Sequence, residues 1–474
     1  MLHLRNVLWQ NARLAVLSPR RGLVTLAIET SCDDTSVAIV NKSRSGAARI
    51  HFLENITPDL TDYKGIHPIL ALQSHQENLA ELVNKALSHL PFAAESPNDA
   101  TKTISLPDGN RQKPDFISVT RGPGMRSNLF VGLDTAKGLS VAWQIPCVGV
   151  HHMQAHLLTP RLVSALSLPS SGPSSSTNSQ SAITPAFPFL SILASGGHTL
   201  LTSSDSLTSH SILATTNDVA IGEALDKSAR AILPSFLLRT SKTSMFGKLL
   251  EQFAFPNGAA DYADYIAPRN RGEEVAVSKV VTPYGWSITA PFAQTKQLEF
   301  SFAVFGPTVE RILSRKREAG EDVSDDERVL LAREVMRVCF EHLASRTILA
   351  LESLCKWTRT PNSNSKPMPE TVPVKTLVVS GGVAANKFLM TVLRSFLDVR
   401  GFGHIEIVAP PPALCTDNAA MIGWAGIEMF EAGWRSERSV KALRKWSLDP
   451  AFEGKTDEEG EGGVLGVQGW VRRG

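Results

Sequence analysis

The chain contains 474 residues, a length that favours two or three domains. Its 48 basic and 46 acidic residues give a formal net charge of +2, so there is no polycationic signature and any nucleic-acid contact must come from a local patch. Five scattered cysteines without a C-x-x-C pair argue against a disulfide framework or a zinc finger and indicate free thiols in a reducing compartment. No apolar run approaches about 18 residues, so we expect no membrane span.

The N-terminal segment is basic and free of acid. No Asp or Glu precedes Glu29, whereas four arginines recur among Leu, Val and Trp. This composition is typical of a mitochondrial presequence, although an ordinary basic arm would share it. We assign residues 1–21 to targeting and expect the protein in the mitochondrial matrix.

Two β-rich runs, residues 23–28 and 35–40, are joined by residues 29–34, which carry hydroxyl and carboxyl groups. A strand–turn–strand unit with such a tip suits a phosphate or a metal-bound phosphate. A plain hairpin turn is the alternative, but it would not need a carboxylate such as Glu29.

Helix and strand signals then follow each other. Residues 67–90 predict a long helix with one apolar side, and residues 115–120 predict a strand. A Gly-rich turn at 121–127 leads into a helix that extends through Lys137. This turn is not a complete G-x-G-x-x-G, and residues 222–228 miss the P-loop pattern, so neither indicates a nucleoside-triphosphate site.

A pair of histidines follows a predicted helix end, a turn at Pro146 and a short apolar strand. If this stretch opens a helix, His152 and His156 lie four residues apart on one face and can bind one metal ion. Surface or capping histidines are the alternative. Met153 stands where the H-E-x-x-H motif of zinc proteases has its catalytic Glu, which argues against a protease.

The sequence Ser-Gly-Gly occurs twice after an apolar strand. It follows residues 187–194 as Ser195-Gly196-Gly197, and it recurs at residues 380–382. Glycines at the end of a strand allow backbone N–H groups to approach a ligand, and a following helix N-terminus favours an anion. The repetition predicts two halves that face one cleft.

Other segments carry weaker signals. Residues 164–186 are Ser/Pro-rich and predict a flexible excursion, and residues 314–328 and 359–373 predict surface loops. The tail is rich in Gly and Glu and is predicted to be disordered. Asp417 precedes an apolar helix from residue 419 to about 432, so it is either an N-cap or a ligand.

Seven collinear segments together resemble the tRNA adenosine threonylcarbamoyltransferase family, and the N-terminal arm resembles its mitochondrial branch. These segments are residues 28–35, 122–124, 151–158, 194–199, 222–227, 380–386 and 415–422. The resemblance implies an α/β, two-lobed actin-like and sugar-kinase-like fold, in which each lobe is a mixed sheet flanked by helices. We divide the chain into an N-terminal lobe (22–160), an insertion (161–186), a C-terminal lobe (187–450) and a disordered tail (451–474).

The resemblance also implies a reaction. Family members transfer the threonylcarbamoyl group from threonylcarbamoyl-adenylate to N6 of the adenosine beside the anticodon in ANN-decoding tRNAs, and they release AMP. One divalent metal ion, iron or zinc, is then expected on His152, His156 and Asp417. The expected adenylate-binding residues are Leu193, Ala194, Ser195, Gly196, Gly197, Asp226, Gly247 and Asn386. Asp33 or Asp34 is the candidate acceptor of the N6 proton.

The resemblance further implies a homodimer that works without a large accessory complex. The chain departs from the family pattern at Phe246, where a Gly is usual, and around Pro307, where the usual Lys is missing. The candidate tRNA contacts are Arg121, Arg126, Arg333, Arg337, Lys387 and Arg394. Two rival functions are a small-molecule kinase or ATPase on the same fold and a nucleotide-binding scaffold without catalysis; the histidine pair argues against the kinase, because Mg²⁺ prefers oxygen ligands.

Overall fold

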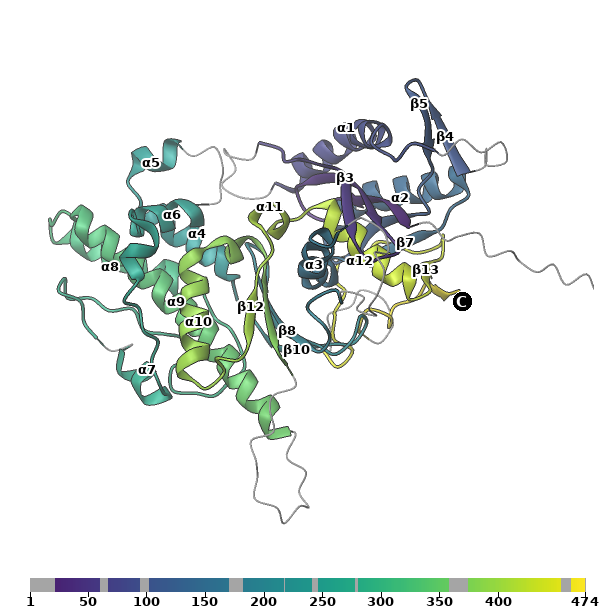
Figure 1. The fold of residues 1–474 in the computed structure, drawn as a ribbon. Helices are drawn as coiled ribbons and strands as arrows, with labels where there is room; N and C mark the ends of the chain where they lie inside the picture. The colour runs from purple at the N-terminus through teal and green to yellow at the C-terminus, as the bar shows by residue number, and fades with distance from the viewer. Residues whose placement is uncertain are drawn as a thin grey trace, which may run out of the picture.

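The computed structural model describes residues 22–59, 67–93, 102–169, 182–216, 218–240, 246–277, 280–357, 374–452 and 462–473. The predicted targeting segment, residues 1–21, lies outside these ranges. The described chain forms two large sheets with helices around them (Figure 1). No helix in the described ranges is long and apolar enough to cross a membrane.

The first sheet has seven strands in the order β14-β13-β7-β6-β1-β2-β3. Strands β1, β2 and β3 form an antiparallel meander, whereas β6 and β7 run parallel to β1. The strands are β1 (Leu23–Glu29), β2 (Thr35–Lys42), β3 (Ala48–Ile56), β6 (Phe116–Gly122), β7 (Cys147–His151), β13 (Trp434–Ser436) and β14 (Trp470–Arg472). A separate hairpin, β4 (Thr103–Leu106) and β5 (Gly109–Gln112), lies beside it.

Alternation along β1 explains how both faces of this sheet are covered. Val24, Leu26 and Ile28 pack with helices α1 (Pro68–Leu87) and α2 (Arg126–Trp143). Ala27 points to the opposite face, where helices α3 (His152–Leu166) and α12 (Ala419–Glu431) pack against each other. The strand is therefore buried on both sides, as its nearly continuous apolar sequence requires.

The second sheet repeats the same plan with the order β10-β9-β8-β11-β12. Strands β8, β9 and β10 are antiparallel neighbours, whereas β11 and β12 run parallel to β8. The strands are β8 (Phe189–Ala194), β9 (Thr199–Ser204), β10 (His210–Thr215), β11 (Thr376–Ser380) and β12 (Glu406–Val408). Two sheets of one plan confirm the predicted two-lobed α/β fold.

Helices of the second lobe pack on the face of this sheet that carries Leu190 and Ile192. They are α4 (Ile221–Ile232), α5 (Ser235–Thr240), α6 (Gly247–Ala254), α7 (Arg271–Val277), α8 (Phe305–Glu318), α9 (Asp325–Trp357), α10 (Lys387–Val399) and α11 (Pro412–Cys415), with the 3₁₀ turns η3 (Gly258–Tyr262) and η4 (Gly382–Ala385). The other face, through Phe189, Leu193 and Val378, shares a core with α3 and α12. These two helices therefore lie between the lobes, as Figure 1 shows for α3.

Several predicted boundaries are wrong. The predicted C-terminal lobe, residues 187–450, ends too late, because α12 and β13 belong to the first lobe. The predicted disordered tail contains β14, which pairs with β13. Most of the loop predicted at 314–328 is helical, because α8 continues to Glu318 and α9 begins at Asp325. The insertion predicted at 161–186 begins inside α3, and residues 170–181 and 359–373 lie outside the described ranges.

Candidate metal centre and adenylate-binding residues

The two predicted histidine ligands share the first turn of α3. His151 ends β7 and caps the helix, since its Nδ1 accepts hydrogen bonds from the backbone N–H groups of Met153 and Gln154. His152 is consequently the first helical residue, and His156 lies one turn further on the same face. Both residues are at most 5% exposed, which rules out the alternative of surface histidines.

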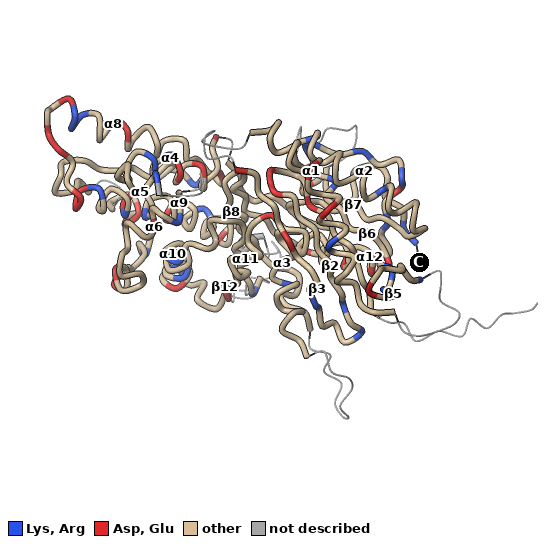
Figure 2. Tube along the Cα trace, turned by 90° about the horizontal axis from the view of Figure 1, so that it is seen from above, with Lys and Arg blue, Asp and Glu red and all other residues tan. Residues whose placement is uncertain are grey.

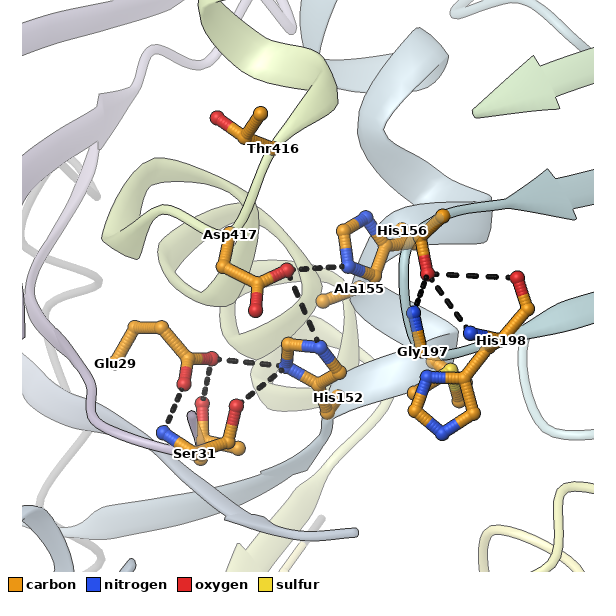
Figure 3. Close-up of polar contacts among 12 residues, drawn as sticks. Glu29, Ser31, His152, Ala155, His156, Gly197, His198, Thr416 and Asp417 are labelled. Carbon is orange, nitrogen blue, oxygen red and sulfur yellow. Dashed lines mark hydrogen bonds and ion pairs between the residues drawn. The ribbon is translucent and has the colours of Figure 1, made fainter. Parts of the chain in front are cut away.

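Asp417 meets these histidines from the connection between α11 and α12. Its predicted alternative role as a helix cap is wrong, because Asn418 caps α12 by accepting the N–H of Met421. The carboxylate Oδ1 of Asp417 lies 3.1 Å from Nε2 of His156 and 3.5 Å from Nε2 of His152 (Figure 3). One ligand atom from each of the three residues lies within 4.8 Å of the others.

A buried carboxylate behind the histidines sets the orientation of His152. Glu29, at the end of β1, is fully buried, and its Oε2 lies 3.0 Å from Nδ1 of His152. The same oxygen accepts the Thr120 hydroxyl at 2.6 Å, while Oε1 accepts the Ser31 backbone N–H at 2.5 Å. With Nδ1 donating to Glu29, Nε2 of His152 is the nitrogen that faces Asp417, and it becomes available to a metal once it releases its proton.

Electrostatics agree with this arrangement. Burial would raise the pKa of Asp417, but the neighbouring His152 and His156 hold it well below the usual range of a carboxyl. Burial would lower the pKa of His152, but Asp417 and Glu29 outweigh that effect and raise it to about 10. The metal-free centre is therefore a tightly coupled ion pair, which a cation can replace on the Nε2 side.

The three residues fit a divalent metal ion. Two imidazoles and one carboxylate form a mixed nitrogen and oxygen set that suits zinc or iron and leaves positions open for a substrate. Nδ1 of His156 is buried without a hydrogen-bond partner among the described residues. Nε2 of His156, and not Nδ1, therefore faces Asp417 and the candidate metal position.

The turn between β1 and β2 brings further carboxylates to this centre. The Cys32 carbonyl accepts hydrogen bonds from Nδ2 of Asn128 at 2.6 Å and from Nε2 of His75 at 3.0 Å, which fixes the turn. Asp34 accepts a hydrogen bond from the Thr57 hydroxyl. Burial, together with the nearby charges of Asp33 and other carboxylates, raises the pKa of Asp34 to about 7, despite that hydrogen bond. Of the two predicted proton acceptors, Asp34 thus has the pKa that suits a base near neutral pH.

The predicted adenylate-binding residues gather in the second lobe at the ends of β8 and β11. Leu193 and Ala194 end β8 and are buried, whereas Gly196 and Gly197 are exposed in the following turn. The Ser195 hydroxyl accepts the backbone N–H groups of Gly197 and His198, at 3.3 and 3.0 Å. Figure 3 shows this turn beside His156.

Two glycines allow these turns to approach each other. Gly381 has a φ of +89°, and a Cβ there would overlap the Ala194 carbonyl. At Gly222, in the first turn of α4, a Cβ would lie 2.7 Å from the Ser195 carbonyl oxygen. Because β8 and β11 are neighbours in one sheet, the two Ser-Gly-Gly turns belong to the same lobe. The prediction that they mark two facing halves is wrong.

Asp226 and Asn386 also lie in this region, but both side chains already cap helices. Oδ1 of Asp226 accepts the backbone N–H groups of Phe246 and Gly247, at 2.7 and 2.9 Å, and so holds the start of α6. Oδ1 of Asn386 accepts the N–H of Leu389 at the start of α10. The backbone of Phe246 makes its bond to Asp226 regardless of its side chain, so this departure from the family pattern leaves the contact intact.

The second departure is equally compatible with the fold. Pro307 lies in the first turn of α8, where a helix needs no backbone N–H donor from that residue. One of the predicted tRNA contacts, however, is wrong, because Arg121 is 1% exposed. Arg337 is partly exposed and paired with Glu334 and Glu341. Figure 2 shows the remaining Lys and Arg interspersed with Asp and Glu over both lobes.

The protein is therefore a two-lobed α/β protein with a candidate metal site. His152 and His156 on α3 and Asp417 before α12 form this site between the two sheets. Comparison with known sequences gives its family. A family model for tRNA N6-adenosine threonylcarbamoyltransferase matches residues 50–424. The chain belongs to this family.

Its relatives match nearly the whole chain. A mitochondrial tRNA N6-adenosine threonylcarbamoyltransferase of Schizosaccharomyces pombe is 34% identical, over 96% of this chain and 90% of the relative. The enzyme of the same name from Bartonella henselae is 31% identical, over 90% and 95% of the two chains. Among solved structures, T. kodakarensis HypF matches 87% of this chain and 48% of its own, with 13% identity and a TM-score of 0.38.

Proposed function

We propose that this chain transfers the threonylcarbamoyl group from threonylcarbamoyl-adenylate to N6 of the adenosine beside the anticodon in ANN-decoding mitochondrial tRNAs and releases AMP. Membership of the family supports the reaction class. The observation that carries the proposal is the convergence of His152, His156 and Asp417 on one point between the lobes. A kinase would have no use for two buried imidazoles there.

His152, His156 and Asp417 would hold one divalent ion, iron or zinc. Bound there, the ion would supply a positive charge that helps to neutralise and orient the negatively charged adenylate. Glu29 keeps His152 in the tautomer whose Nε2 faces the ion. The role of the protein is thus mainly positioning, since AMP is already a good leaving group.

In the transfer step, the N6 amine attacks the carbamoyl carbon, the bond from that carbon to the phosphate oxygen breaks, and AMP leaves with the electron pair. The N6 nitrogen must lose a proton as the new bond forms. Asp34 is the acceptor that we propose, because its raised pKa of about 7 makes it a stronger base than an ordinary carboxylate while it still ionises near neutral pH.

The adenylate would lie against residues 193–197, Asp226, Gly247 and Asn386. Both backbone N–H groups that bind Asp226 go to Oδ1, so we assign Oδ2 to the ribose hydroxyls. The amide nitrogen of Asn386 donates one N–H to Sδ of Met336, and its other N–H would read the base, since the carbonyl oxygen caps α10. The capping bonds hold both side chains in place before the ligand arrives.

We further propose that the protein acts as a homodimer in the mitochondrial matrix. The name of the Schizosaccharomyces pombe relative and the acid-free basic N-terminus support the location. For tRNA, Arg126 and Lys387 remain the exposed candidates among the basic residues singled out from the sequence.

The test combines metal content with transfer activity. Residues 22–474 are purified as wild type, His156→Ala, Asp417→Ala and the control His404→Ala, whose histidine is exposed in the second lobe. We expect metal and transfer to an ANN-decoding tRNA transcript to be lost together in the two site variants and retained in the control. Transfer by either variant at the wild-type rate would contradict the proposed centre.

A further inference from the structure

The C-terminal segment, which we define as residues 440–449 and 462–473, returns to the first lobe. There it contacts Arg121 near the end of β6 and His151 at the end of β7. Leu443 and Trp446 are at most 3% exposed, and β14 joins the first sheet. In Figure 1 this yellow segment lies beside β7 and β13. Apart from its short strand it has no regular structure, yet it is built into the core.

Arg121 holds this segment at two separate points. The buried guanidinium donates from Nε to the Lys441 carbonyl at 3.0 Å and from Nη1 to the Gln468 carbonyl at 2.8 Å. The Arg121 carbonyl accepts the Leu443 backbone N–H at 2.9 Å. Since Arg121 directly follows Thr120, which binds Glu29, the segment is fastened at the strand that supports the centre.

A second contact reaches the helix that carries both histidine ligands. His151 accepts two backbone N–H groups of α3 at Nδ1, so its proton must reside on Nε2. Nε2 lies 3.0 Å from the Trp446 carbonyl oxygen and therefore donates to it. The imidazole ring also packs on the Trp446 indole, with ring centroids 4.5 Å apart. His151 thus connects the start of α3 to the C-terminal segment.

The same stretch reaches the second lobe. Oδ2 of Asp449 accepts the backbone N–H of Ile212 in β10 at 2.8 Å. Leu448 and Val464 belong to the core that α3 shares with both sheets. The segment is therefore fixed relative to both lobes, and a helix start fastened to it is fixed as well.

We propose that the C-terminal segment positions the metal centre, and that His151 is the residue through which it acts. This inference rests on the metal site of the proposed function. His151 touches neither substrate nor metal; it fixes the first turn of α3, where His152 is the first helical residue. A first-turn ligand needs this support, because the capping imidazole can hold the helix start in place only if it is itself held, here through Nε2 by the Trp446 carbonyl.

Two substitutions separate the functions of the two imidazole nitrogens. In His151→Asn the side-chain oxygen can replace Nδ1 as the helix cap, but nothing reaches the Trp446 carbonyl. In His151→Gln the longer amide can place an N–H near the position of Nε2, but the cap is weakened. A role as a cap alone predicts that Asn preserves the centre, whereas the proposed connection predicts that Gln preserves it better.

The measurement is the affinity of residues 22–474 for Zn²⁺, by competition with a chromophoric chelator, together with kcat and KM for transfer. Thermal unfolding is followed in parallel. We expect His151→Asn to bind Zn²⁺ roughly 10- to 100-fold more weakly and to lose kcat, and His151→Gln to retain more of both. Wild-type affinity in His151→Asn, or a loss in His151→Gln as large as in His151→Asn, would overturn the proposal.

A second pair of variants keeps the test decisive if His151→Asn does not fold. Arg121→Met removes the hydrogen bonds to the Lys441 and Gln468 carbonyls and so releases the C-terminal segment from β6. We expect a similar loss of Zn²⁺ affinity. Arg435→Met is the matched control, because that guanidinium donates to the Phe430 and Trp434 carbonyls and lies over the Phe430 ring, and neither residue belongs to the C-terminal segment. Equal Zn²⁺ affinity in the two arginine variants would overturn the proposal. A wild type that binds no Zn²⁺ would instead overturn the proposed metal site and this inference together.

Discussion

Replacing Glu29 by glutamine tests how the buried carboxylate supports the metal centre. The wild-type carboxylate accepts three hydrogen bonds, from the Ser31 backbone at Oε1 and from Thr120 and His152 at Oε2. Glutamine has the same shape but only one oxygen. If its amide nitrogen takes the Oε2 position, it faces the N–H of His152; if it takes the Oε1 position, it faces the N–H of Ser31.

In either orientation an N–H group of glutamine faces another N–H donor in a fully buried place. In the first orientation, His152 can avoid this only by moving its proton to Nε2, where the metal should bind. An unsatisfied buried donor costs about 1–3 kcal/mol. Because each 1.4 kcal/mol is a factor of about ten, we expect metal affinity to fall roughly 5- to 150-fold in Glu29→Gln.

The assay is Zn²⁺ competition with a chromophoric chelator, accompanied by circular dichroism to establish folding. Glu54→Gln is the control, because the exposed side chain of Glu54 on β3 pairs with Lys85 of α1 rather than with a residue of the metal centre. Zn²⁺ affinity in a folded Glu29→Gln within threefold of wild type would refute the role that we assign to Glu29.

Three further predictions concern catalysis and stability. If Asp34 accepts the N6 proton, kcat/KM rises with pH through about 7 in the wild type and through a lower pH in Asp33→Asn, which lacks a charge that helps to raise the pKa of Asp34, whereas Asp34→Asn loses this step. Burial lowers the pKa of His210 to about 4, so below pH 6.5 the unfolded chain binds a proton that the folded chain does not. His210 then costs up to about 3 kcal/mol as pH falls from about 6.5 to 4, and urea unfolding should show His210→Gln losing less stability over this range than wild type. Gly426→Ala should destabilise the fold by about 1–3 kcal/mol in the same assay, because the new methyl group overlaps the Ser118 hydroxyl under α12.

The predictable parts of the centre were those with local signatures. His152 and His156 are one helical turn apart in the sequence, so their common face followed from periodicity alone. The strand–turn–strand at Glu29 was also predictable, because a charged residue at the end of an apolar strand indicates a buried partner. The identity of that partner, His152, was not predictable, since 123 positions separate the two residues.

The errors have a common physical origin in long-range contacts. The tail is rich in Gly and Glu, which predicts disorder, yet Val464 and Val467 are buried. The basic residue Arg121 suggested a tRNA contact. Its guanidinium is instead buried and donates hydrogen bonds to backbone carbonyls 320 and 347 positions away in the sequence. Composition within a segment cannot reveal partners that lie elsewhere in the chain.

The central claim is that this chain places the threonylcarbamoyl group on one adenosine of tRNA. The most direct measurement is nucleoside mass spectrometry of an ANN-decoding tRNA transcript after incubation with metal-loaded residues 22–474 and synthetic threonylcarbamoyl-adenylate. We predict modified adenosine from the wild type, none from Asp417→Ala, and none from a transcript in which guanosine replaces the adenosine beside the anticodon. Unmodified tRNA from a wild type that holds its metal and binds the adenylate would contradict the claim.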